Sequence, residues 1–88
     1  MLTDNENIII NLIIKLAKEI DETCTINIIN YTYSARLEIQ TTAELRPIIF
    51  NKVKILLKEF KIPLNLTTFN KNKVTLLSFD FMSSNFKN

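Results

Sequence analysis

The stretch that decides the fold is Cys24 to Gln40, CTINIINYTYSARLEIQ. Its apolar residues recur at every second position in two short runs, which are separated by the polar segment 30–32. Alternation with a period of two is typical of strands that bury one face, so the stretch predicts a β-hairpin. Because the chain contains no Gly, we expect the turn to depend on Asn30, a residue type that tolerates the left-handed region.

Helical spacing flanks this hairpin on both sides. Residues 3–21 and 41–61 carry apolar side chains at intervals of three and four, as amphipathic helices do. Each segment opens with Thr followed three residues later by Glu, which is typical of a capping box. Pro47 predicts that the second helix either begins properly there or is kinked. The predicted core stripes are Ile9, Leu12, Ile13, Leu16, Ala17 and Ile20, and Leu45, Ile49, Val53, Leu56, Leu57 and Phe60.

The second half of the chain also ends in alternating residues. Segments 64–68 and 74–82 predict two further strands around a turn at 70–72, and 83–88 is expected to be a frayed polar tail. A shift of 40 residues superposes both helices and both hairpins, with 8 identities in 36 pairs. Biased composition and shared periodicity could imitate a repeat, but the identities fall in register, so we predict a duplication with pseudo-repeats 3–40 and 41–82.

Two such units predict one α+β domain over residues 1–88. Its expected architecture is a tandem αββ-αββ repeat that forms a four-stranded antiparallel sheet with two helices on one face, because neither hairpin could bury enough surface alone. The side chains expected to face the helices are Cys24, Ile26, Ile28, Ala35, Leu37, Ile39, Leu64, Leu66, Leu77, Phe79 and Phe81.

Composition makes several kinds of chemistry improbable. The lack of Gly removes phosphate-binding loops and nucleophile elbows, and the lack of His removes the commonest general base and metal ligand. Cys24 has no His to activate it, and its parity predicts a buried structural thiol. The acidic pair Asp21-Glu22 is explained by a solvated helix end. We therefore predict a protein that is not an enzyme and has no cofactor or metal site.

Source and compartment are also indicated by composition. The excess of Ile and Asn over Gly is typical of an AT-rich genome, such as that of a low-GC bacterium, its phages or plasmids, or an AT-rich eukaryote or virus. The acidic N-terminus does not resemble a signal peptide, and the apolar run 8–16 is too short and too polar to span a bilayer. A single Cys fits a reducing cytosol, so we expect a cytoplasmic protein with no membrane partner.

Charge divides the chain into an acidic half and a basic half. Residues 1–44 carry a net charge of −4 and residues 45–88 a net charge of +6. The basic residues either form a solvated lysine face or bind an acidic partner, which would be nucleic acid or an acidic protein surface. Nucleic acid is the less favoured partner, because the basic half contains one Arg. The predicted basic patch is Arg46, Lys54, Lys58, Lys61, Lys71 and Lys73.

Apolar residues extend beyond the core stripes. Ile10 and Ile14 widen the first helix, and Ile29, Tyr31 and Phe69 lie on the predicted outer face of the sheet. Local cover or a binding patch explains them equally well. We expect a non-catalytic protein-binding module, an accessory or inhibitor protein of phage or plasmid type that covers a partner surface. The alternative is a nucleic-acid-binding domain. We also expect a homodimer through Ile10 and Ile14, unless a foreign partner takes that patch.

Overall fold

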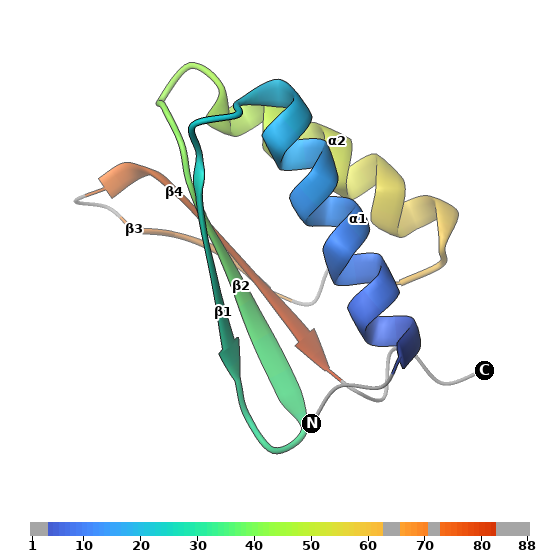
Figure 1. The fold of residues 1–88 in the computed structure, drawn as a ribbon. Helices are drawn as coiled ribbons and strands as arrows, with labels where there is room; N and C mark the ends of the chain where they lie inside the picture. The colour runs from blue at the N-terminus through green and yellow to red at the C-terminus, as the bar shows by residue number, and fades with distance from the viewer. Residues whose placement is uncertain (1–3, 63–65, 71–72, 83–88) are drawn as a thin grey trace.

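The computed structural model describes the backbone of residues 4–62, 66–70 and 73–82, and the side chains of residues 7–62 and 75–81. The predicted α+β class is confirmed, and both helices lie on one face of an antiparallel sheet (Figure 1). Residues 83–88, which we predicted to be a frayed tail, lie outside the described residues. The elements are α1 (Asp4–Ile20), β1 (Thr25–Asn30), β2 (Ser34–Gln40), α2 (Arg46–Glu59), β3 (Leu66–Asn70) and β4 (Lys73–Met82).

The predicted first hairpin is present, but its turn differs from the prediction. Strands β1 and β2 pair antiparallel without interruption, from Thr25 opposite Gln40 to Asn30 opposite Ala35. Asn30 is thus a strand residue, and the turn closes where the N–H of Tyr31 donates to the carbonyl of Ser34 at 2.8 Å. Among the described residues, positive φ occurs at Lys61 and not at Asn30, so the predicted dependence of the turn on Asn30 is wrong.

The second helix begins without the predicted capping box. The Thr41 hydroxyl donates instead to Oδ2 of Asp21 at 2.6 Å, which ties the end of β2 to the end of α1. Thr42 takes over part of the capping role, because its Oγ1 accepts from the N–H of Leu45 at 3.2 Å. Pro47 lies in the first turn of α2, where its missing N–H costs no intrahelical hydrogen bond.

The sheet prediction needs correction. The strand order is β1-β2-β4-β3, and the continuous antiparallel sheet consists of three strands, β1, β2 and β4, whose pairings show no register shift. Strand β3 pairs with β4 through its backbone, and that register shifts between Thr68 and Asn70. The predicted four-stranded antiparallel sheet is therefore wrong: three strands pair regularly, and β3 joins β4 through an irregular pairing.

The predicted tandem repeat is not shown either. In the first hairpin Ile26 lies opposite Ile39, so a repeat of 40 residues would place Leu66 opposite Phe79. Leu66 instead lies opposite Asp80, and Thr67 lies opposite Phe79. A slip of one residue exchanges the two faces of a strand, so the second hairpin is not a copy of the first. The similarity between the halves at a shift of 40 residues thus does not extend to strand pairing.

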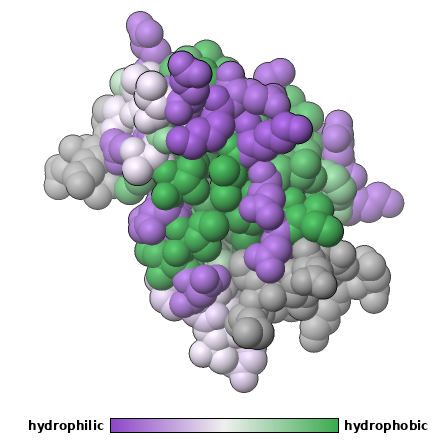
Figure 2. All heavy atoms as spheres, viewed as in Figure 1, coloured by the Kyte–Doolittle hydropathy of each residue, from purple (hydrophilic) through white to green (hydrophobic). Residues whose placement is uncertain are grey.

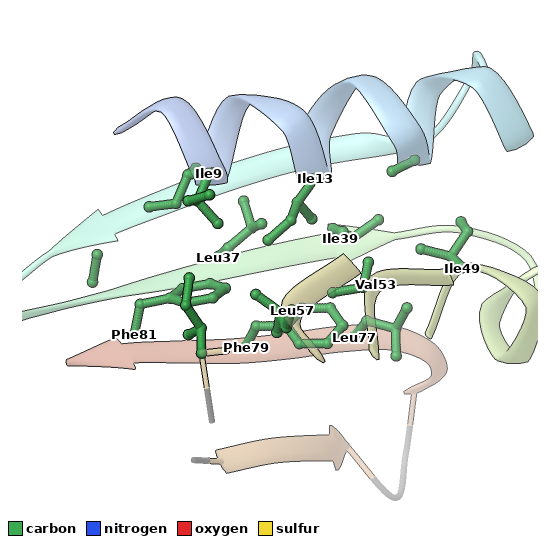
Figure 3. Packing of buried hydrophobic residues seen from close by; sticks show 14 of the residues in the cluster. Ile9, Ile13, Leu37, Ile39, Ile49, Val53, Leu57, Leu77, Phe79 and Phe81 are labelled. Atoms are coloured by element: carbon green, nitrogen blue, oxygen red, sulfur yellow. The ribbon is translucent and has the colours of Figure 1, made fainter. Parts of the chain in front are cut away.

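One hydrophobic core joins the helices to the sheet (Figure 3). Phe50 of α2 stacks on Phe79 of β4, with ring centroids 6.3 Å apart. Most of the predicted inward set is buried, but Ile26 is half-buried, Ile28 is exposed, and the side chains of Leu64 and Leu66 are not described. The buried cluster is Ile9, Ile10, Ile13, Ala17, Cys24, Ala35, Leu37, Ile39, Ile49, Val53, Leu57, Ile62, Leu77, Phe79 and Phe81.

Candidate functional site

The first feature of the candidate site is one side of α1. At about 100° per residue, Ile10 and Ile14 lie on one side of the buried stripe, and Ile8 and Leu12 lie on the other. Ile10 is only 2% exposed, and the half-buried Ile14 packs against the core. Since α2 is the helix that lies beside α1 (Figure 1), we infer that it covers this side of α1. Our expectation that Ile10 and Ile14 form an exposed patch is therefore wrong. The open side of α1 carries Ile8, which is 56% exposed, and Leu12, which is 37% exposed.

The second feature is the neighbouring strand β1. Ile28 lies opposite the buried Leu37 and hence on the helix side of the sheet, yet it is 40% exposed. Figure 2 shows apolar surface over β1 and between β1 and α1, with hydrophilic residues around it. We call Ile8, Leu12 and Ile28 the open flank. Its members were not among the predicted binding residues.

The third feature is the free backbone edge of β1. The strand order leaves β1 with a partner on one side only among the described elements. In an antiparallel ladder, residue pairs that exchange backbone hydrogen bonds alternate with pairs that do not. The hydrogen bond between Tyr31 and Ser34 shows which pairs of β1 and β2 are the hydrogen-bonded ones. The N–H and C=O groups of Ile26, Ile28 and Asn30 consequently point away from β2. They point to the side on which the open flank lies.

The other face of the sheet is more polar than predicted. Arg36 Nε lies 2.7 Å from Asp80 Oδ1, and this ion pair joins β2 to β4. Ile29 is half-buried and lies opposite Arg36, whereas Tyr31 is exposed at the end of the hairpin. The side chain of Phe69 lies outside the described residues, so the prediction that it forms one patch with Ile29 and Tyr31 stays a prediction.

The predicted basic patch is only partly described. Lys54 and Lys58 are exposed on α2, together with Lys52, which we had not included in the patch. Lys61 is exposed but lies beyond the end of α2, and Arg46 is half-buried. Lys71 lies outside the described residues, and the side chain of Lys73 is not described. A basic surface is thus described along α2 alone.

The groups with potential chemistry near the end of α1 have structural contacts. Cys24 is buried as predicted, and burial raises the pKa of its thiol, which disfavours the nucleophilic thiolate. Asp21 is buried rather than solvated, and its carboxylate accepts from Thr41 Oγ1, Thr23 Oγ1 and Thr23 N. These hydrogen bonds, the one from Thr41 first, hold the pKa of Asp21 below its usual range. Asp21 therefore fastens the chain where α1 ends.

Comparison with protein-family models, curated proteins and solved structures finds no match for this chain. Within the described residues, no three Cys, Asp or Glu side chains gather closely enough to hold a metal ion. Neither helix in the described part of the chain has the length and apolar character needed to cross a membrane.

Proposed function

We propose that this chain is a non-catalytic protein-binding module and that it binds through the open flank and the free edge of β1. Its role would be that of an accessory or inhibitor protein that covers a partner surface. The inhibitor role and a phage or plasmid origin remain predictions from composition.

One observation carries the proposal, namely exposed apolar side chains beside unpaired strand backbone. Apolar side chains next to water gain free energy when a partner covers them. Backbone groups at a strand edge can pair with an extended segment of another chain, a common mode of protein recognition. The coincidence of both features on one side of the molecule favours binding of protein over binding of a small ligand.

Capture from a low-GC bacterial lysate with matched variants would test the proposal. Leu12→Glu places a charge on the open flank, and Ile55→Glu places the same charge on an exposed position of α2. We expect a captured protein that Leu12→Glu loses and Ile55→Glu retains. Retention by both variants, or capture of nothing by the wild-type chain, would contradict binding of a foreign protein at this surface.

The lysines of α2 support a second candidate, nucleic-acid binding. Lys52, Lys54 and Lys58 are exposed, and Glu59 is the only acidic residue of this helix. Phosphate contacts would make the affinity for labelled DNA or RNA fall steeply with salt, and Lys54→Glu would weaken it at every salt concentration. An absence of binding at low salt would dismiss this candidate.

A further inference from the structure

Strand β1 itself has none of the residues or irregularities that usually protect a sheet edge. Its sequence, TINIIN, contains no charged residue and no Pro, and its pairing with β2 shows no bulge. Natural edge strands are commonly protected by Lys, Pro, bulges or covering segments, because an open edge can pair with another strand. Within the described part of the chain, an edge strand without Lys, Pro or a bulge, next to exposed Ile28, is suited to receive a strand.

The charges near this edge do not oppose a second copy of the chain. Glu38 accepts a hydrogen bond from Asn27 Nδ2 at 3.2 Å, and Arg36 is paired with Asp80. The whole chain carries a formal net charge of only +2. Two copies can therefore approach with β1 facing β1 without placing like charges opposite each other in the paired strands.

Backbone geometry limits how two copies of β1 can pair. When two β1 strands pair antiparallel around a two-fold axis, residues lie opposite each other across the axis. The helices of both copies then lie on the same face of the joint sheet only if opposite residues are both even-numbered or both odd-numbered. The outward groups belong to Ile26, Ile28 and Asn30. The outward backbone groups of all three residues can form hydrogen bonds across the axis when Ile28 lies opposite its own copy and Ile26 lies opposite the other copy's Asn30.

We infer that the chain forms a symmetric dimer in which β1 pairs antiparallel with β1 of a second copy, centred on Ile28. The inference rests on the proposed function and names the partner at that surface. Pairing extends the sheet across the two chains and satisfies the outward backbone groups of both edges. It also brings the open sides of the two α1 helices together above the new strand pair, which removes Ile8, Leu12 and Ile28 from water.

Sedimentation equilibrium with matched variants tests the inference. Ile28→Lys adds an inward-facing charge at the two-fold axis, and Ile48→Lys makes the same change at a position of α2 that is 47% exposed. We expect a wild-type dimer, a rise of roughly tenfold or more in the dissociation constant for Ile28→Lys, and no change for Ile48→Lys. A monomeric wild-type chain, or equal weakening by both variants, would overturn the inference.

Disulfide trapping reports the register without depending on the Ile28→Lys variant. In a Cys24→Ala background, Ile28→Cys lies opposite itself at the axis, within the Cα separation that a disulfide accepts. We expect Ile28→Cys to cross-link faster than Ile48→Cys under mild oxidation. Equal rates would overturn strand pairing at this edge.

The outcomes separate this inference from the proposed function. If the wild-type chain is monomeric and a foreign protein is captured only when Leu12 is intact, the dimer is wrong and the protein-binding module stands. If the chain is a dimer and no foreign protein is captured, self-pairing stands and the accessory role is lost.

Discussion

At the scale of single residues, Asp21 joins three parts of the chain. Its Oδ1 accepts from Thr23 N at 3.1 Å and Thr23 Oγ1 at 2.7 Å, and its Oδ2 accepts from Thr41. Because the pKa of Asp21 is lowered in the folded state, the ionised carboxylate stabilises the fold above the pKa of the unfolded chain. That stabilisation is lost as the pH falls through the lower pKa of the folded state.

We therefore expect Asp21→Asn to lower the free energy of unfolding at neutral pH and to lower it progressively less as the pH falls below about 4. Urea unfolding at a series of pH values measures this difference. Glu22→Gln is the control, because Glu22 is an exposed neighbour whose backbone carbonyl, rather than its side chain, accepts from Lys18. If Asp21→Asn lowers the free energy of unfolding by the same amount at every pH, ionisation of Asp21 does not contribute to stability.

At the scale of elements, the end of α2 shows how a helix ends in a chain without Gly. The N–H of Ile62 donates to the carbonyl of Leu57 at 2.9 Å, and the N–H of Lys61 donates to that of Lys58 at 3.1 Å. This is a Schellman motif, in which the residue at the position of Lys61 is usually Gly. Lys61 has φ of 57°, and the left-handed region is unfavourable for a residue with a Cβ.

Lys61→Gly is expected to raise the free energy of unfolding by about 1 kcal/mol, because it removes the steric penalty at this position. Thermal or urea unfolding would measure the gain. Lys58→Gly, in the last turn of the same helix, should destabilise the chain and serves as the control. Lys61→Gly at or below wild-type stability would argue against the left-handed conformation.

Periodicity predicted the type and approximate bounds of both helices and of the first hairpin, because burial on one face leaves a repeating pattern. It could not predict the register of β3 on β4. A slip of one residue changes which residue of β3 lies opposite Phe79, and a short run such as 64–68 does not specify that pairing by itself. Polar contacts between distant segments were also missed, since nothing near Thr41 indicates that its hydroxyl would be used by Asp21.

At the scale of the whole molecule, the error about which side of α1 is exposed has one cause. The width of the apolar stripe on α1 correctly indicated that some of it would remain exposed. The pattern is nearly symmetric about the stripe, so the sequence of α1 does not indicate which of Ile10 and Leu12 is buried, and the packing of α2 beside α1 is what breaks the symmetry. That choice depends on how the chain crosses the sheet, which the sequence of one helix does not contain.

The single core predicts that the molecule unfolds as one unit. Ile13 of α1 and Leu77 of β4 are both fully buried in the same cluster, although they belong to different layers. Ile13→Ala and Leu77→Ala should each lower the free energy of unfolding by about 2–5 kcal/mol. Unfolding can be followed by the circular dichroism of the helices and by the tyrosine fluorescence of the hairpin end, where Tyr31 and Tyr33 are exposed. Because the layers share one cluster, each substitution should shift the unfolding midpoints of both signals by the same amount. Ile55→Ala, at an exposed position of α2, should shift neither signal, and separate midpoints for the two signals would show that helices and sheet do not unfold together.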